Sequence, residues 1–211
     1  MEESQQILKD LAAPFIRTED GRNYPAIKWK AGAASQNKKK VSCFPYIDAR
    51  QACQRLNQVV GVNWKSINTK LTRNNNIMEA TCELSILING EWITRTDTGT
   101  AGKSALKGDR GEEIQTKGAV SDSIKRAAVQ WGIGAYLYDI DPIWVDYNGK
   151  MPITKDGKPL YPKELNNYLN KLNTNLGLFY QIVTNRPEIK NDTAFNYMSK
   201  LFAGSPITKK K

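Results

Sequence analysis

The chain has 211 residues, enough for one compact domain with extensions. It carries 31 lysine and arginine residues against 21 aspartate and glutamate residues, and this net charge of +10 favours polyanionic partners. It contains no histidine, which excludes histidine-based catalytic triads and histidine-ligated metal sites. The three cysteines, Cys43, Cys53 and Cys82, form no Cys-x-x-Cys pair and indicate reduced, partly buried thiols.

No apolar run in the sequence is long enough to cross a bilayer. The first residues, MEESQQILKDL, are too acidic and polar for a signal peptide. We therefore expect a soluble protein of the cytoplasm.

The first third of the chain predicts two helices separated by irregular segments. Residues 5–30 combine a short apolar helix candidate with a stretch containing proline, glycine and asparagine, and residues 31–40 predict a flexible basic loop. Residues 46–60 place their apolar side chains on one helical face, and Gly61 follows where a C-terminal cap belongs.

Residues 64–98 predict a three-stranded antiparallel meander. Apolar and polar side chains alternate over residues 77–88, which is the pattern of a half-buried strand. Asn89-Gly90 is a two-residue hairpin signal that leads into a strand over residues 91–98. Residues 64–73 form the partner strand, which ends at an asparagine-rich turn over residues 74–76.

A Gly- and Lys-rich loop over residues 99–111 precedes a long helix predicted for residues 112–131. One face should pack on the sheet through an apolar seam at Val120, Ile124, Ala127 and Trp131. An adjacent stripe consists of Lys117, Ser121 and Lys125, with Arg126 further round, and its lysines and arginine should present positive charge.

After Asp139 the chain becomes rich in proline, tyrosine and glycine, which predicts an irregular extension or a small hairpin centred on Asp156-Gly157. Weaker helical patterns follow over residues 163–172 and 193–202, and three lysines end the chain. We therefore expect a domain over residues 1–140 and a C-terminal extension over residues 141–211 with short helices and a basic tail.

Residues 97–104, DTGTAGKS, approach the pattern of a phosphate-binding loop without completing it. Such a loop needs glycine where Asp97 stands, because backbone amides must wrap the phosphates closely, and its strand belongs to a parallel sheet. The pattern therefore favours a flexible basic loop over an ATP site. Gly132 and Gly134 follow a helix instead of a strand, so they predict a helix end and not a dinucleotide site.

Basic residues lie beside aromatic residues at several points of the chain, as in the segment KWK at residues 28–30. Proteins that bind single strands combine a positive groove with planar side chains on which bases stack. Because Trp64, Trp92 and Trp131 are expected to face the core, we interpret the lysines and arginines as DNA contacts and the tryptophans as packing.

The segment KGAVSDSIKRAAVQWGIGAYLYD, residues 117–139, resembles the helix signature of the Rad52 superfamily of single-strand annealing proteins. The resemblance extends upstream to YIDAR at residues 46–50, to Leu56-Asn57 and to Gly61 with Trp64. The segments AAPF at residues 12–15 and IKWK at residues 27–30 are closer to the bacterial and phage branch, the Sak and DdrA types. The resemblance covers about residues 14–139.

This resemblance implies rings or helical filaments of identical copies, in which the DNA backbone runs in a positive groove with its bases turned outward. Carried over to this chain, it places Lys125 and Arg126 in the groove, with Lys117 two turns earlier. Lys30 and Tyr46 correspond to the upstream basic and aromatic partners.

The chain departs from the family pattern at two places. Eukaryotic members have another arginine three residues after the Lys-Arg pair, where this chain has Val129, so we expect Arg50, Arg55 or the lysines at 38–40 to replace that contact. The outer DNA site of the family has no clear counterpart, and its candidates here are Arg95, Lys103 and Lys107.

We therefore predict an α+β fold, with an antiparallel meander of three or more strands packed against a long basic helix, assembled into oligomeric rings or filaments. The predicted function is to bind single-stranded DNA and anneal complementary strands without ATP, in homologous recombination or double-strand break repair. The annealed duplex is the intermediate, no cofactor or catalysis is needed, and a single-strand binding protein is a candidate partner. The bacterial cytoplasm or nucleoid is the expected location, and the compact form favours a phage source.

Two alternatives stay open. One is a DNA-end-protecting binder that does not anneal. The other is a DNA-processing enzyme that uses either a nucleotide at Lys103-Ser104 or a metal ion at the nearby acids Asp97, Asp109, Glu112 and Glu113, whose spacing matches no known metal site.

Overall fold

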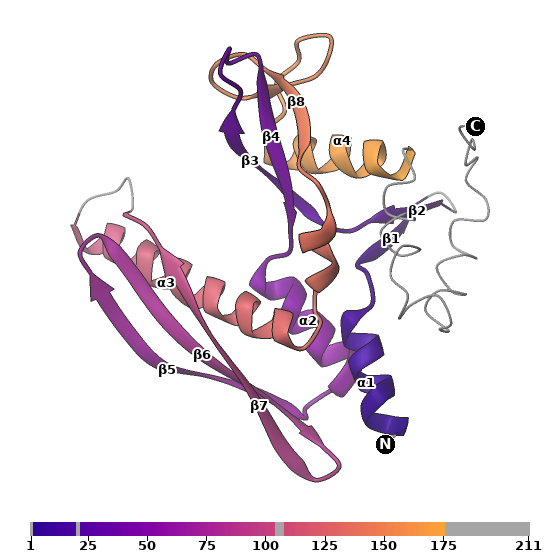
Figure 1. Cartoon of the computed structure of the whole chain (residues 1–211), viewed down its shortest axis with the longest axis vertical. Coiled ribbons are helices and arrows are strands. Elements are labelled where there is room, and N and C mark those ends of the chain that lie inside the picture. The colour runs from indigo at the N-terminus through magenta and orange to yellow at the C-terminus, as the bar shows by residue number, and fades with distance from the viewer. Residues whose placement is uncertain (1, 20–21, 104–107, 176–211) are drawn as a thin grey trace. The chain divides into compact units, whose positions relative to one another are not determined.

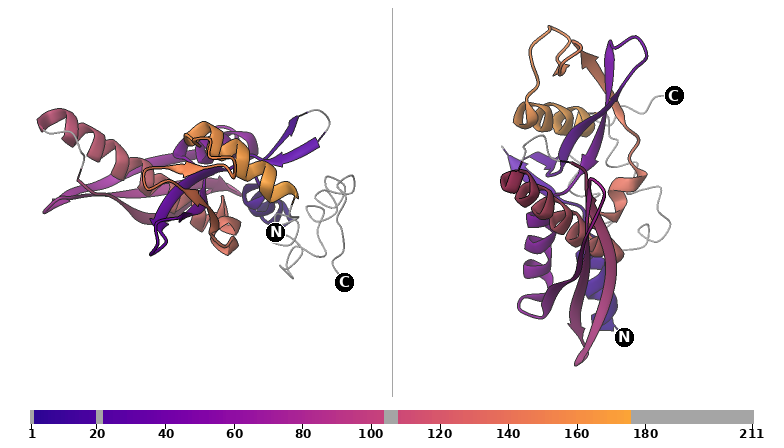
Figure 2. Two further views of the ribbon diagram at one scale, coloured as in Figure 1. Left: turned by 90° about the horizontal axis from the view of Figure 1, so that it is seen from above. Right: turned by 90° about the vertical axis from the view of Figure 1, so that its left-hand side faces the viewer.

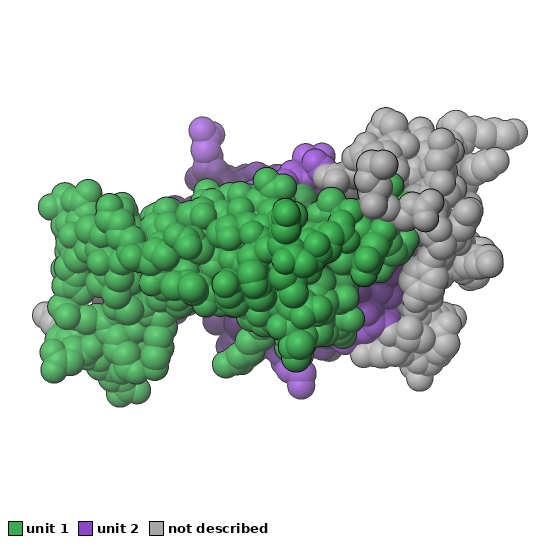
Figure 3. Space-filling model, turned by 90° about the horizontal axis from the view of Figure 1, so that it is seen from below, with its two compact units in different colours: residues 1–13, 47–135 green, residues 14–46, 136–211 purple. Residues whose placement is uncertain are grey.

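The computed structural model describes residues 2–19, 22–103 and 108–175 and divides the chain into two compact units. Unit 1 combines residues 1–13 with residues 47–135, and unit 2 combines residues 14–46 with the chain from residue 136 onward (Figure 3). This division does not coincide with the expected boundary at residue 140, because each unit is built from two separate segments of the chain. Among the described residues, no helix has the length and apolarity needed to span a membrane.

Unit 1 begins with two helices, α1 (Glu2–Ala12) and α2 (Ala49–Val60). The start of α2 is fixed by a capping box, in which the Asp48 side chain accepts from the Gln51 amide and the Gln51 side chain accepts from the Asp48 amide. The helix therefore begins three residues later than the pattern predicted. It ends as expected at Gly61, whose φ of 60° lies in the left-handed region.

The predicted meander is confirmed as a three-stranded antiparallel sheet in the order β5 (Trp64–Asn74), β6 (Ile77–Ile88) and β7 (Glu91–Ala101). Asn89 and Gly90 both have positive φ, as a two-residue hairpin turn of the primed type requires. Strand β7 continues to Ala101, three residues beyond its predicted end, and pairs with β6 over its whole length.

The two faces of the meander differ in burial. The even-numbered residues of β6 from Met78 to Ile88 are buried, as the alternation predicted. The long helix α3 (Gly108–Gln130) lies along this face in both views (Figures 1 and 2). It begins four residues earlier than predicted and ends at Gln130, just before the turn at Gly132, whose φ is +87°.

The described residues of unit 2 form two sheets and one α-helix. Strands β1 (Ile16–Glu19) and β2 (Arg22–Pro25) pair with each other. A second sheet has the order β3 (Lys28–Ala34), β4 (Lys40–Tyr46), β8 (Ile143–Tyr147) and β9 (Pro152–Ile153). The short 3-10 helix η1 (Ala135–Asp139) precedes β8, and α4 (Pro162–Asn175) follows β9.

Two predictions for this part of the chain need correction. The loop expected over residues 31–40 is shorter, because β3 runs to Ala34 and β4 begins at Lys40. The segment after Asp139 is not irregular throughout, since β8 adds to the sheet beside β4. The alternative of a small hairpin centred on Asp156-Gly157 is confirmed, because Ile153 pairs with Pro159 across this turn and Gly157 has a φ of 81°. The helix expected over residues 163–172 is confirmed as α4, and the one over residues 193–202 lies outside the described residues.

Helix α4 is tied to the β3 end of this sheet through a buried tryptophan. Trp29 is 2% exposed, and its indole Nε1 donates to the Asn170 side chain at 2.7 Å, while its amide donates to Asn166 at 2.7 Å. The core of unit 2 therefore lies between α4 and the face of the sheet that carries Trp29, Val41, Cys43 and Val145. The fold as a whole is α+β with antiparallel sheets, as predicted.

Candidate nucleic-acid interface

Helix α3 lies unusually close to the meander, because small residues face the sheet at intervals of four. Gly111, Ala119, Ser123 and Ala127 are buried along this line, and the remaining position is the buried Gln115, whose side chain donates to the Ala101 carbonyl at the end of β7. The closest approach is at Gly99 on β7, where a β-carbon would lie 2.0 Å from the backbone nitrogen of Ser123. The predicted seam is therefore correct at Ala127 and Trp131, which are buried. Val120 is half-buried and packs against Met78 and Ala80 of β6, whereas Ile124 is only half-buried beside the line of small residues.

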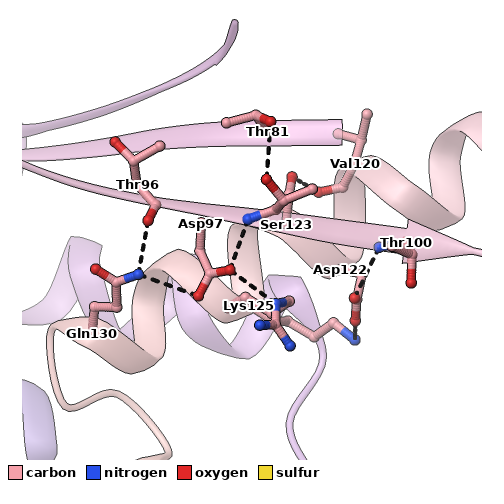
Figure 4. Close-up of polar contacts among 11 residues, drawn as sticks. Thr81, Thr96, Asp97, Thr100, Val120, Asp122, Ser123, Lys125 and Gln130 are labelled. Atoms are coloured by element: carbon pink, nitrogen blue, oxygen red, sulfur yellow. Dashed lines mark hydrogen bonds and ion pairs between the residues drawn. The ribbon is translucent and has the colours of Figure 1, made fainter. Parts of the chain in front are cut away.

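Asp122 holds Lys125 at the edge of this contact. Its carboxylate accepts the backbone amide of Thr100 on β7 at 3.2 Å and pairs with Lys125 Nζ at 2.9 Å (Figure 4). Both side chains are about one-third exposed. The ammonium group of Lys125 is thus anchored at the boundary between α3 and β7 and still reaches solvent.

Asp97 of β7 holds Arg126 in a similar way. Its carboxylate accepts from Arg126 Nε at 3.0 Å, from the Gln130 side chain at 3.2 Å and from the Thr98 amide at 2.7 Å (Figure 4). Partial burial pushes the pKa of Asp97 upward, but these hydrogen bonds and the charge of Arg126 outweigh it and hold the pKa below its ordinary value. Asp97 therefore stays ionised and keeps Arg126 at the surface, with half of its side chain exposed.

Arg95 lies two residues before Asp97 on the same face of β7. Its guanidinium carbon is 5.4 Å from the ring centroid of the buried Trp131, a cation–π contact. Two residues along a strand span about 7 Å, so Arg95 and Arg126 form one short basic edge. Lys103 is exposed just beyond the end of β7.

Lys117 lies on the outward half of α3, eight residues before Lys125, or about 12 Å along the helix. It pairs with Glu113 one turn earlier, and this hydrogen bond and charge lower the pKa of Glu113. An exposed pair of this kind contributes little to stability, so Lys117 can exchange this partner for a phosphate. The structure thus places Arg95, Lys117, Lys125 and Arg126 on α3 and the adjoining strand.

The two upstream candidates lie together on unit 2. Lys30 is opposite Phe44 in the pairing of β3 with β4, and Tyr46 is opposite Lys28. Residues directly opposite each other in an antiparallel pair point to the same face, so Lys30 and Tyr46 share one face of this sheet.

The model of Rad52/22 family double-strand break repair proteins matches residues 19–153, which is more than half of the chain. The chain belongs to this family. The match continues beyond Asp139, where the sequence resemblance was expected to stop, and so includes β8 and β9.

Two bacterial relatives of this Rad52/22 family chain are both named single-stranded DNA-binding protein DdrA. The protein from Deinococcus deserti is 33% identical over 161 residues, which cover 75% of this chain and 67% of the relative. The protein from Deinococcus radiodurans is 30% identical over 144 residues, which cover 67% of this chain and 59% of the relative. The matched segment thus spans about two thirds of the first relative and less than two thirds of the second.

One of the predicted contacts is wrong. Arg55 is buried, and its guanidinium donates to the backbone carbonyls of Asp10 at 2.8 Å and Ala13 at 2.5 Å. It satisfies carbonyl groups at the end of α1 and is not available to a phosphate. Arg50, in contrast, is exposed in the first turn of α2, and Lys107 lies outside the described residues.

The geometry gives little support to the nucleotide site or the metal site that the enzyme alternative requires. Residues 97–101 form the end of β7 and pair with β6, so they do not wrap a phosphate, and Ser104 lies outside the described residues. Glu112 pairs with Arg73 at 2.7 Å, and Glu113 pairs with Lys117. In the described part of the chain, no three acidic or cysteine side chains are grouped to hold a metal ion.

The cysteines are free in the described structure. Burial raises the pKa of Cys43 and of Cys82 to about 11, which keeps both thiols protonated at neutral pH. Burial also raises the pKa of Cys53. The three residues are packing side chains, as the sequence predicted.

Sequence reasoning missed several functional candidates. It treated Asp97 as a flaw in a phosphate loop or as one acid of a metal site, and it did not consider that Asp122 and Asp97 would orient the basic pair. It also assigned Trp92 to the core, whereas Trp92 is 45% exposed with Lys65 Nζ 4.2 Å above its ring. Phe44 and Trp144 were not considered, although the segment IWVDY around Trp144 has the alternation of a strand.

Proposed function

We propose that this chain binds single-stranded DNA through its phosphate backbone and anneals complementary strands without ATP, in homologous recombination and double-strand break repair. The observation that carries the proposal is the family match over residues 19–153. The names of the two DdrA relatives support binding of single-stranded DNA. The exposed cations of α3 and β7 support a contact with phosphates.

Annealing without sequence preference fits the kind of contacts available. Lysines and arginines bind phosphates through release of counterions, which gives affinity without reading the bases. The base edges then stay accessible to a complementary strand. Neutralised phosphates also reduce the repulsion between the two strands.

The proposal includes further steps that the resemblance implies. Copies of the chain assemble into a ring or a helical filament, and the annealed duplex leaves as the product. A single-strand binding protein is the candidate partner that presents the strands. Lys30, Tyr46, Arg50, Arg95, Lys103, Lys107, Lys117, Lys125 and Arg126 are the proposed DNA contacts.

The test is annealing of two complementary labelled oligonucleotides in the absence of ATP and metal ions. We expect Lys125→Ala/Arg126→Ala to slow annealing at least tenfold and to weaken binding of single-stranded DNA. The plot of log affinity against log salt concentration should become less steep by roughly 1.4, since each phosphate contact to a single strand contributes about 0.7.

The matched control is Lys155→Ala/Lys158→Ala, which removes the same two positive charges from an exposed turn of unit 2. If this control loses as much activity as the α3 variant, net charge and not the α3 site drives annealing. Activity only with ATP or a metal ion would contradict the proposal. Tight binding without annealing would favour the end-protecting binder, since the names of the two relatives state binding of single-stranded DNA and not annealing.

A further inference from the structure

The four-stranded sheet of unit 2 (β3, β4, β8 and β9) has one face that α4 does not cover. Residues with odd numbers on β4, such as Val41 and Cys43, are buried on the α4 side with Trp29. The residues between them point to the opposite face, and strand pairing aligns them with their neighbours on β3 and β8. This second face carries Lys30, Lys40, Ser42, Phe44 and Trp144.

Two large aromatic side chains on this face remain exposed. Phe44 is 38% exposed and Trp144 is 50% exposed, although each lies on one of the two inner strands of the four-stranded sheet. The Phe44 ring lies across β3 at Gly32, where a β-carbon would come within 2.5 Å of a ring atom. Trp144 is directly opposite Ser42, which is buried next to it on β4.

Lysines lie on the same face and in the adjoining turn. Lys30 is exposed directly opposite Phe44, and Lys38 and Lys39 are exposed in the turn between β3 and β4. Lys40 lies two residues before Ser42 and has one acidic neighbour on this face, Asp146, at 3.7 Å. The described part of this face thus combines a net positive charge with two exposed ring systems.

We propose that Phe44 and Trp144 form a stacking platform for unpaired bases of single-stranded DNA, with Lys30 and Lys40 contacting the adjacent phosphates. The proposal rests on the proposed function and adds a site that binds bases to one that binds phosphates. A single strand is the matching ligand because its base faces are accessible, whereas a duplex covers them by stacking. The lysines supply the charge complementarity that an uncharged apolar partner would not need.

The test compares two labelled 20-nucleotide strands with the same phosphates, oligo(dT) and a strand of abasic residues, by fluorescence anisotropy with the full chain. Wild type should bind oligo(dT) more tightly than the abasic strand. Phe44→Ala/Trp144→Ala should lose between about 5- and 100-fold in affinity for oligo(dT), as expected for base–aromatic stacking. Its affinity for the abasic strand should stay within about twofold.

Two further variants separate stacking from other causes. Phe44→Leu/Trp144→Leu keeps apolar side chains on the face and should lose the preference for oligo(dT) as fully as the alanine variant. Tyr161→Ala removes another exposed aromatic side chain of unit 2, outside this face, and should behave as wild type. Circular dichroism and thermal unfolding check that each variant is folded.

The outcomes distinguish this proposal from the proposed function. If both double variants bind oligo(dT) as tightly as wild type while Lys125→Ala/Arg126→Ala does not, the platform is wrong and the proposed function stands. Leucine variants that retain the preference would also overturn stacking, because apolar contact alone would explain it. If wild type binds neither strand, both proposals fail.

Discussion

Asp97 and Asp122 each orient one cation of the Lys125–Arg126 pair, so the charge of the candidate site depends on two carboxylates as well as two cations. Exposed ion pairs are weak, and a phosphate can compete for the same cation. The carboxylates restrict the conformations of two long side chains before DNA binds. Binding therefore loses less side-chain conformational entropy. Lys125 and Arg126 are therefore already oriented before DNA binds.

The lowered pKa of Asp97 predicts how stability depends on pH. A carboxyl group whose pKa is lower in the folded state contributes stability that is fully present above its unfolded pKa, near 3.9, and is lost as the pH falls through the folded pKa. Asp97→Asn should therefore lower the melting temperature at pH 7 and have little effect near pH 2. Thermal unfolding of both proteins across this range measures the difference.

Asp156→Asn is the matched control, since it removes one carboxylate from an exposed turn of unit 2. A difference between wild type and Asp97→Asn that stays constant from pH 7 to pH 2 would contradict the role of the ionised carboxylate. It would point to the shape of the side chain instead.

At the residue scale, the sequence predicts charge better than it predicts exposure. Lys125 and Arg126 could be found because a recognisable family signature surrounds them in the sequence. Arg55 and Trp92 could not be assigned, because their environments depend on contacts with α1 and with Lys65 on another strand. Such contacts leave no local pattern in the sequence.

At the scale of elements, the contact between α3 and β7 decides where the basic residues lie. Gly99 and the small residues of α3 allow the helix backbone to approach the strand, so the side chains of Asp97, Asp122 and Arg126 meet at the edge. Small residues have weak hydrophobicity, which is why the periodicity placed the seam at Val120 and Ile124. The existence of the helix was predictable, but its rotation on the sheet was not.

Gly99→Ala tests this close approach. The added β-carbon would meet the backbone of Ser123, so the strand and the helix must move apart. We expect a loss of about 1–3 kcal/mol in the free energy of unfolding, the usual range for overpacking, measured by urea denaturation. Annealing should also slow, because Arg126 loses its position beside Asp97.

Gly102→Ala is the control three residues further along, where no atom lies within 4 Å of the added β-carbon. It should change the free energy of unfolding by less than about 0.5 kcal/mol. Equal effects of the two substitutions would mean that β7 and α3 do not approach as closely as the structure indicates.

At the scale of the whole molecule, the chain crosses between its two units three times, after residues 13, 46 and 135. In the four-stranded sheet of unit 2, β4 from the first quarter of the chain pairs with β8, which lies beyond residue 140. Sequence reasoning could not predict this pairing, because the separation of the two strands leaves no local signal and the segment around β8 contains proline and glycine. The local meander of unit 1 was predictable for the opposite reason, since a tight turn joins its neighbouring strands.

A chain truncated after residue 140 tests whether the predicted first domain is a folding unit. The truncation removes β8, β9 and α4, so Val41 loses its partner Val145, and Trp29 loses the side chains of Asn166 and Asn170. Hydrogen exchange measured by mass spectrometry should show that residues 28–46 lose their protection. Residues 77–88 should keep theirs, because β6 is covered by α3 and flanked by two strands within unit 1. If residues 28–46 stay as protected as in the full chain, the boundary at residue 140 is the correct one, and β3 and β4 do not need the later segment.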